Sequence, residues 1–362
     1  MIYKYLIRPF LFQMDPEEAH EKVMQLLSQG RVVARIFESY YAVNDPKLLV
    51  ETMGLRFRNP VGLAAGLDKN AVAFAVWEKI GLGFIEIGTV TPRPQEGNPR
   101  PRVFRLVENQ ALINRLGFNG IGVDAVYENI KQASGSSIPK GINVGKNRNT
   151  PNEQAAADYL EVMEKLMDFA DYFVINVSSP NTLGLRDLQH PSKVASIVKA
   201  AVNLVSSYSN QSAGRPVPVL VKVAPDFDGE DLEDTIDAAL EAGVSGIIAT
   251  NTTLSRRGLK PSRFINETGG MSGVPLCKLA DHVVKRIFRR TQGRIPIIGV
   301  GGIFSAEDAF KRICCGASLI QVCTGLVYEG PSLVRRINKG LIVLLQRNRL
   351  ASISEAVGRD CS

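Results

Sequence analysis

Histidine and cysteine are scarce in this sequence of 362 residues, and their scarcity removes several kinds of site. The five cysteines form no C-x-x-C pair and have no histidine at ligand spacing, so we predict no metal site and a reducing compartment without disulfides. None of the three histidines directly follows a predicted strand. His20 and His282 fall on predicted helices with structural roles, and only His190 lies in a loop from which it could approach a site. The usual general base is therefore missing.

Long apolar segments are also missing. The longest runs, such as Leu341–Leu345, are far too short to span a bilayer, and no secretory signal is visible. Any membrane contact must therefore be peripheral. The formal net charge is +7, and basic residues cluster in residues 285–294 and 335–349, which we interpret as two solvated helix faces in preference to a surface for anionic lipid. Nucleic acid is not expected as a partner, because no basic stripe is interleaved with aromatic residues.

The N-terminal part of the chain is predicted to form short helices. Asp15 and Pro16 suit a helix start, apolar positions follow at helical spacing, and Gly30 suits the stop. A second, mostly apolar helix is predicted over Val32–Tyr40, and residues 48–58 are predicted to form a small hairpin. We therefore divide the chain into a helical extension (1–45), a main domain (46–349) and a C-terminal tail (350–362).

From Pro60 onward, short apolar runs alternate with longer amphipathic segments. The eight runs that we predict as strands are Val61–Ala64, Phe84–Ile87, Gly141–Val144, Tyr172–Val177, Val219–Val223, Gly246–Thr250, Ile295–Val300 and Leu319–Val322. A helix is predicted after each strand, the last over Ser332–Arg347. Continuous apolar strands indicate a parallel sheet covered on both faces, and this number of strand–helix units favours a closed (β/α)8 TIM barrel of the α/β class over an open sheet.

The carboxyl ends of these strands carry the candidate site. Two long connections, Thr89–Phe118 and Leu254–Pro275, follow strands at the face where barrel active sites lie, and the first is predicted to contain a hairpin near Arg102–Leu112. Almost every strand ends in glycine or a polar residue. The glycines of Gly299–Gly302 and Gly325, after the last two strands, would let backbone N–H groups close on a phosphate. No G-x-G-x-x-G follows a strand, so a Rossmann dinucleotide site is not supported.

The candidates for chemistry at this rim are Ser178, Ser179, Lys69 and Lys222, whereas Asp68 is expected to cap the next helix. A lysine at an inner strand end could form a Schiff base, as in barrel aldolases, or place a fixed positive charge beside a cofactor ring. Because no acid–base partner is evident, we favour the electrostatic role. An aldolase that uses Lys222 and a non-catalytic phosphate-binding barrel are the alternatives from other classes.

Six motifs at the strand ends carry a resemblance to a known family. They are Ala64–Lys69 (AAGLDK), Glu86–Gln95 (EIGTVTPRPQ), Asn114–Asn119 (NRLGFN), Asn176–Asn181 (NVSSPN), Ala249–Thr253 (ATNTT) and Gly299–Gly302 (GVGG). In this order they resemble the dihydroorotate dehydrogenases, and among these the membrane-associated branch that reduces quinone, class 2. The resemblance covers roughly residues 1–345.

The resemblance implies an activity and its residues. It implies that the chain binds FMN and oxidises dihydroorotate to orotate in pyrimidine synthesis, with a membrane quinone as electron acceptor. Ser179 matches the base that removes a proton from carbon 5, where the soluble branch has cysteine. The implied substrate-binding residues are Lys69, Asn114, Arg115, Leu116, Gly117, Phe118, Asn176, Asn181, Asn251 and Thr252. The implied FMN-binding residues are Ala65, Gly66, Lys69, Thr89, Asn143, Asn176, Lys222, Thr250, Gly273, Gly302, Cys323 and Thr324.

Two positions depart from the family pattern. Cys323 stands where relatives often carry an aromatic residue, so we expect its backbone N–H to be the group that binds phosphate. Gly120 stands where many relatives have a second asparagine, so the resemblance is carried over to Asn114–Phe118 only.

The N-terminal helices imply a second site. In the family they form an apolar funnel that leads quinone to the flavin and rests on the bilayer. The residues that could do so here are Ile2, Leu6, Phe10, Leu11 and Phe12, although a helical cap packed on the barrel also explains them. We expect a monomer bound peripherally at the cytoplasmic side of the cell membrane. Another FMN barrel with a different substrate or electron acceptor is the nearest alternative.

Overall fold

Eight parallel strands close into a barrel in the part of the chain that the computed structural model describes, which is residues 2–29, 40–132, 137–212, 216–227 and 229–361. The strands are β3 (Val61–Leu63), β4 (Phe84–Val90), β7 (Lys140–Val144), β8 (Tyr172–Asn176), β9 (Val219–Val223), β10 (Gly246–Ala249), β12 (Ile297–Val300) and β13 (Leu319–Val322). Their order around the barrel follows the chain, and β13 closes on β3. The predicted TIM barrel is confirmed, and each predicted strand lies within a few residues of an observed one.

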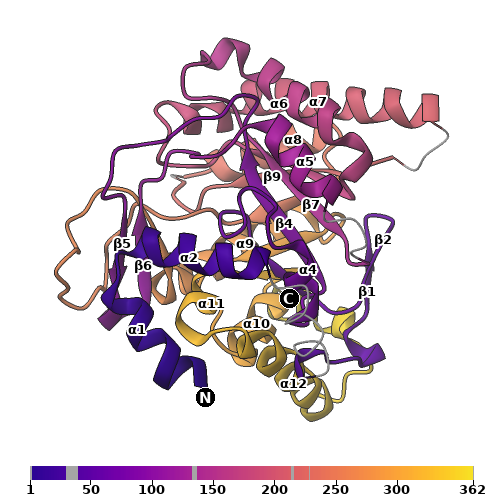
Figure 1. The fold of residues 1–362 in the computed structure, drawn as a ribbon. Helices are drawn as coiled ribbons and strands as arrows, with labels where there is room; N and C mark the ends of the chain where they lie inside the picture. Colours follow the sequence, from indigo (N-terminus) through magenta and orange to yellow (C-terminus); the bar gives the residue numbers. More distant parts are fainter. Residues whose placement is uncertain (1, 30–39, 133–136, 213–215, 228, 362) are drawn as a thin grey trace.

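Helices surround this barrel, as predicted (Figure 1). They are α4 (Phe74–Lys79), α5 (Val123–Gln132), α6 (Ala155–Leu166), α7 (Pro191–Ser212), α8 (Asp231–Glu241), α9 (Cys277–Thr291), α10 (Ala306–Cys314), α11 (Thr324–Glu329) and α12 (Ser332–Arg347). The last of them has the predicted bounds. The predicted hairpin is also present, as β1 (Val50–Thr52) paired with β2 (Leu55–Phe57).

The inside of the barrel is filled with side chains. The strand residues are almost all buried, which is why they read as continuous apolar runs. A glycine makes room for one large ring: a Cβ on Gly141 would lie 2.1 Å from the ring of Tyr172 on the neighbouring strand. The barrel is therefore a packed core, and any site must lie at its rim.

The two long connections meet in a small antiparallel sheet outside the barrel. The first contains β5 (Val103–Leu106) and β6 (Ala111–Asn114), which confirms the predicted hairpin. The second adds a strand that the sequence did not predict, β11 (Gly270–Gly273), which pairs with β6. This pairing joins the loop after β4 to the loop after β10 and forms one wall beside the barrel mouth.

The N-terminal extension consists of a short π-helical turn (Tyr3–Ile7), α1 (Arg8–Gln13) and α2 (Pro16–Ser28). Asp15 caps α2 as predicted, because its carboxylate accepts hydrogen bonds from the backbone N–H groups of Glu17 and Glu18 at 2.8 and 3.1 Å. Both helices lie beside β5, β6 and α11 (Figure 1). Residues 30–39, which include most of the predicted second helix, lie outside the described residues.

A buried ion pair holds α2 against the barrel loops. Arg102 donates from Nε to both carboxylate oxygens of Glu17 at 3.0 and 3.1 Å, and from Nη2 to one of them at 2.7 Å. The two side chains are 6 and 7% exposed. Arg100 adds a bond to Glu17 at 3.3 Å and one to Glu21 at 2.6 Å. The extension is therefore held by specific charges as well as by apolar packing.

The two basic segments differ in their surroundings. On α9, Arg286 pairs with Glu233, and Arg290 pairs with Asp237, so this segment binds α8 and two of its positive charges are paired. On α12, Lys339 and Arg347 are exposed. Residues 350–361 pack beside α9 and α10, with Ile353 and Ala356 buried.

Candidate active site

One cavity of about 520 Å³ extends from the carboxyl ends of the barrel strands to the N-terminal helices. All the predicted site residues line it except Arg115, Asn143 and Ser178. The cavity has two parts with different chemistry. Amide and hydroxyl side chains gather at the strand ends, and apolar side chains of α1 and α2 line the way out.

Asn176 is the centre of the polar part. Its Nδ2 donates to Thr89 Oγ1 at 2.9 Å and to Asn143 Oδ1 at 3.0 Å. Its Oδ1 accepts from the Nδ2 of Asn251 at 3.3 Å. Asn251 also donates to Ser178 Oγ at 3.0 Å. These bonds link the ends of β4, β7, β8 and β10, so the amide groups are oriented before any ligand arrives.

Ser179 lies next to this network in the loop after β8 and is 6% exposed. Among the described residues, the hydrogen bond given to its hydroxyl comes from the backbone N–H of Asn181 at 3.3 Å. Asn181 in turn donates to Asn114 Oδ1 at 3.1 Å. The serine therefore lies beside Asn181, and no carboxylate or imidazole in the described part of the chain is hydrogen-bonded to it.

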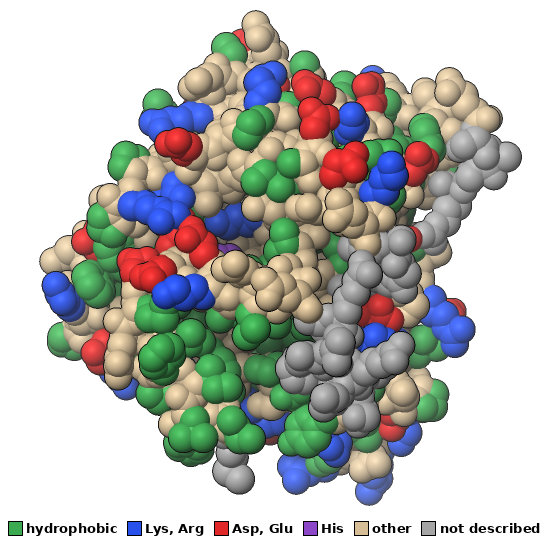
Figure 2. Space-filling view, in the orientation of Figure 1, with side chains coloured by type: hydrophobic (Ala, Val, Ile, Leu, Met, Phe, Trp, Pro, Cys, Tyr) green, Lys and Arg blue, Asp and Glu red, His purple; other side chains and the backbone are tan. Residues whose placement is uncertain are grey.

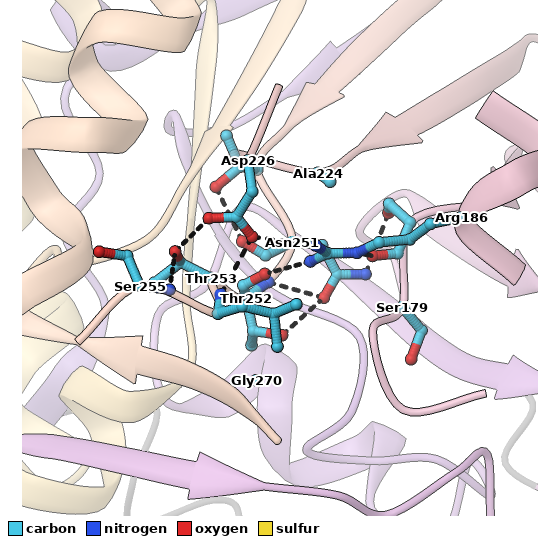
Figure 3. Close-up of polar contacts among 12 residues, drawn as sticks. Ser179, Arg186, Ala224, Asp226, Asn251, Thr252, Thr253, Ser255 and Gly270 are labelled. Atoms are coloured by element: carbon cyan, nitrogen blue, oxygen red, sulfur yellow. Dashed lines mark hydrogen bonds and ion pairs between the residues drawn. The ribbon is translucent and has the colours of Figure 1, made fainter. Parts of the chain in front are cut away.

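An arginine fixes the loop that carries Ser179 (Figure 3). Arg186 donates to the carbonyl oxygens of Ser178 and Thr252 at 3.2 and 2.9 Å, and it pairs with Asp226 at 3.0 Å. Asp226 also accepts a hydrogen bond from the hydroxyl of Thr253. The loops after β8, β9 and β10 are thus held together at the side of the site.

A charged network forms the floor of the cavity. Lys222 Nζ lies 3.6 Å from Glu86 Oε1, and both side chains are buried. Glu86 accepts two further bonds, from Asn143 Nδ2 at 2.8 Å and from Gln321 Nε2 at 2.5 Å. Asn143 is therefore below the cavity surface, where it positions Thr89 and Asn176 instead of lining the space.

The ends of β12 and β13 provide a backbone cradle. Gly302 has a φ of +73°, and a Cβ there would lie 2.5 Å from Cys277 Cβ, so no other residue fits without displacing α9. Thr324 begins α11, and its hydroxyl bonds to that of Ser272 at 2.7 Å. Burial raises the pKa of the Cys323 thiol to about 11, so the thiol stays protonated at neutral pH. This is the strand-end position where TIM barrels bind phosphate.

Lys69 lies between the polar and the apolar part and donates to Asn119 Oδ1 at 2.8 Å. Burial lowers the pKa of its ammonium group to about 8, with Glu17 acting in the opposite direction. Its neighbour Asp68 does not cap α4 as predicted, since that helix begins at Phe74. Asp68 instead accepts bonds from Val72 N, Ala73 N and the Trp77 indole, which fixes the loop that carries Lys69.

The apolar part is a funnel whose walls come from the extension. The side chains of Leu11, Phe12, Val23 and Leu27 line it. Ile2, Leu6 and Phe10 do not, because they lie on the opposite side of the extension and are 67 to 70% exposed. The five residues predicted for the funnel and the bilayer therefore divide into an inner and an outer group.

One predicted residue and two histidines take other places. Arg115 turns away from the cavity, where it pairs with Glu267 at 2.6 Å and stacks on Phe104. His190 is exposed and bonds to Ser192 at 3.0 Å, so it does not approach the site. His20, for which we expected a structural role, lines the cavity beside Lys69.

The sequence of the strand ends and the fold point to one family. A family model described as Dihydroorotate dehydrogenase matches residues 47–345. The chain belongs to the dihydroorotate dehydrogenase family. This confirms the family that the six motifs indicated.

Relatives of this family resemble the chain over nearly its whole length. A protein of Anaeromyxobacter dehalogenans (strain 2CP-1 / ATCC BAA-258) named dihydroorotate dehydrogenase (quinone) is 47% identical over 356 residues, which cover 98% of this chain and 96% of the relative. One of the same name from Gloeobacter violaceus is 46% identical and covers 98% of both chains. A crystal structure of DHODH from Eimeria tenella in complex with ferulenol has a TM-score of 0.89, with 40% identity over 96% of each chain.

Several residues of this dihydroorotate dehydrogenase site were not found from the sequence. They are Glu17, His20, Arg102, Arg105, Arg186 and Asp226. Except for His20, each bonds to a partner that is distant along the chain, as Glu17 and Arg102 do across 85 positions. The one local signal was the position of Glu17 and His20 in the first turns of a capped helix, which says nothing about what that helix faces.

Proposed function

We propose that this protein oxidises dihydroorotate to orotate in pyrimidine synthesis and passes the electrons through FMN to a membrane quinone. The observation that carries the proposal is the single cavity in which a set of asparagines, Ser179 and an apolar funnel meet. A substrate rich in amide groups needs the polar wall, and an apolar electron acceptor needs the apolar wall. A flavin that reacts with both would lie where the two walls meet.

The substrate would be held by Asn114, Asn176, Asn181 and Asn251. Amides suit the imide and carbonyl edges of a pyrimidine, since they offer a donor and an acceptor without a charge to desolvate. Leu116, Gly117, Phe118 and Thr252 complete this part of the wall. Arg115 would act from outside, by fixing the end of β6 through its bond to Glu267.

Ser179 would remove the proton from carbon 5 of the substrate while hydride leaves carbon 6. A serine hydroxyl is a weak base, but this proton is acidified by the adjacent carbonyl, and close positioning lowers the barrier further. Because no titratable side chain of the described residues bonds to Ser179, its own proton must pass to water as it takes the substrate's.

The residues at the strand ends fit FMN, which would supply the hydride acceptor when bound. Thr89, Asn176 and Thr250 present polar groups that would contact its ring, and the buried ammonium group of Lys222 would stabilise negative charge on that ring. Asn143 would act through Thr89 and Asn176. The loop after β3 would add Ala65, Gly66 and Lys69 to the flavin site. The ribityl phosphate would be held by backbone groups of Gly273, Gly302, Cys323 and Thr324.

The quinone would enter along the apolar funnel from a membrane surface. Hydrophobic side chains gather at the lower left of Figure 2, where α1 lies. Ile2, Leu6 and Phe10, in and beside this helix, are exposed. The exposed Lys339 and Arg347 of α12 would add attraction to anionic headgroups. No helix among the described residues is long and apolar enough to cross a bilayer. We propose a monomer held peripherally at the cytoplasmic face of the cell membrane by residues 1–45, with the barrel in residues 46–349 and the tail in residues 350–362.

A substitution of Ser179 tests the proposal. Ser179→Ala should keep FMN, seen in the visible spectrum, and should slow flavin reduction by dihydroorotate by roughly 10²- to 10⁴-fold, the usual contribution of a general base. Ser179→Cys should recover part of this loss, because a thiol can also accept the proton. The rate is measured by anaerobic stopped-flow in a single turnover. An unchanged rate in Ser179→Ala would refute the assignment of the base.

A further inference from the structure

A second cavity, of about 750 Å³, lies on the other side of α2 from the funnel. It is polar, and its walls include Gln95, Asn98 and Arg100 of the loop after β4 and Glu21 of α2. The exposure of Arg100 and Glu21, whose side chains are 57 and 54% exposed, shows that this cavity reaches solvent.

The two cavities share a thin wall. The residues that line both are Glu17, His20, Met24, Leu67, Lys69 and Asn119. Three of these are titratable. Glu17 is held by Arg102 through three hydrogen bonds, so its carboxylate is fixed in the buried ion pair. His20 and Lys69 are the two shared groups that can exchange a proton with both sides.

Other polar groups along the funnel are committed to different partners. The hydroxyl of Tyr3 donates to Val327 O at 2.6 Å, and Arg105 donates to Met14 O at 2.7 Å. Arg105 keeps its proton under all ordinary conditions, since a guanidinium is not deprotonated in proteins. Among the described residues, His20 and Lys69 thus remain as proton carriers for a molecule in the funnel.

We propose that the polar cavity is the proton inlet for quinone reduction, with His20 as the residue that hands protons to the quinone and Lys69 as its partner in the shared wall. This rests on the proposed function. Dihydroorotate gives up two electrons and two protons, and its protons pass to solvent. Quinol formation takes up these two electrons together with two protons from solvent. At each quinone oxygen an O–H bond forms as an imidazole N–H breaks, and the imidazole regains a proton from water in the polar cavity. His20 is unchanged after each transfer.

The electrostatics of the wall suit a neutral relay. Burial lowers the pKa of His20 to about 4, helped by the charge of Lys69 and opposed by Glu17. A neutral imidazole has one nitrogen that donates and one that accepts, which is what a relay needs. The charged groups that face it are Glu17 and Glu21 from α2, Lys69 from the loop after β3, and Arg100 and Arg102 from the loop before β5.

The test separates the two half-reactions in the full-length protein with its flavin. His20→Ala should leave flavin reduction by dihydroorotate unchanged and should slow reoxidation by a short-chain quinone at least tenfold, mainly in kcat and not in KM. Added imidazole, which fits the polar cavity, should restore most of the rate. His190→Ala is the matched control, because His190 is exposed and lines neither cavity, and imidazole should not affect it.

A second variant and a spectroscopic measurement distinguish the loss of proton transfer from a loss of packing. His20→Gln keeps polarity and size and should be as slow as His20→Ala, since an amide does not relay protons at this rate. In the parent, nitrogen NMR of labelled histidine should show His20 neutral from pH 8 down to about pH 5, as its pKa of about 4 requires.

Each outcome bears on one claim. If quinone reoxidises the flavin of both His20 variants at the parent rate, the proposed proton inlet is refuted. So would a loss confined to KM, or a loss that imidazole does not restore, because either shows that His20 only shapes the quinone site. If the parent flavin is not reduced by dihydroorotate at all, the proposed function fails, which is a separate observation made before quinone is added.

Discussion

The Glu17–Arg102 ion pair gives the most exacting prediction about the extension. Glu17→Ala leaves Arg102, which is 6% exposed, without its carboxylate partner. Removing one partner of a buried ion pair costs about 3–5 kcal/mol. Since every 1.4 kcal/mol is about tenfold, the fraction of molecules with α2 detached should rise by roughly 10²- to 4 × 10³-fold. Glu17 belongs to α2 and Arg102 to the loop before β5, both outside the barrel strands, so the loss should be local.

The neighbouring Glu18 provides the control. Its partner is Lys22, one helical turn away on the surface, and the side chains are 52 and 60% exposed. Such a pair contributes about 0.3–0.5 kcal/mol, so Glu18→Ala should change little. Hydrogen exchange of the α2 amides measures how often the helix detaches. The rate of quinone reduction then shows whether detachment impairs the funnel. Equal exchange in the two variants would refute the role that we give to the buried pair.

The same pair predicts a response to acid. Burial acts to raise the pKa of Glu17, but the hydrogen bonds and charge of Arg102, with Arg100 and Lys69, outweigh it and lower the pKa below its ordinary value of 4.5. A lowered pKa in the folded state means that the contribution is fully present above pH 4.5 and is lost as the pH falls through the lower value. Exchange of α2 in the parent should therefore accelerate only on the acid side of pH 4.5, and Glu17→Ala should lack this step.

Two other changes test the rim and the funnel. Arg186→Leu removes the bonds to Ser178 O and Thr252 O, so flavin reduction by dihydroorotate should fall about tenfold or more, whereas Arg257→Leu, at an exposed position nearby, should not change it. Equal rates in the two variants would show that Arg186 does not position Ser179. Removal of residues 1–42 should spare reduction of the flavin by dihydroorotate but should cripple quinone reduction and binding to liposomes, and a truncated protein that reduces quinone as well as the intact one would refute the funnel.

The sequence predicted the barrel well because its strands are decided by local composition. Runs such as Ile297–Val300 are buried on both faces and carry no polar side chain, and the cap at Asp15 depends on residues within one turn. The strand Gly270–Gly273 was missed because two of its four residues are glycine and its pairing with β6 is set by a chain segment far away. Local pattern carries little information about such a strand.

The site was predictable where motifs place residues at strand ends and not where contact depends on long-range packing. Ser179 and Asn176 follow a strand, so the fold alone brings them to the rim. Arg115 lies in a recognisable motif, but its direction is set by Glu267, which is distant along the chain. His20 was assigned a structural role because a helix position does not reveal that the helix faces a cavity. For the same reason, the sequence did not show which residues of the extension line the funnel and which face outward.

The central claim is that one cavity receives electrons from dihydroorotate and delivers them to quinone. Its most direct test is the visible absorbance of the purified protein under anaerobic conditions. We predict a flavin band that bleaches when dihydroorotate is added and returns when quinone is added, but not when fumarate or NAD is added. A colourless protein, or a flavin band that dihydroorotate leaves unchanged, would contradict the account.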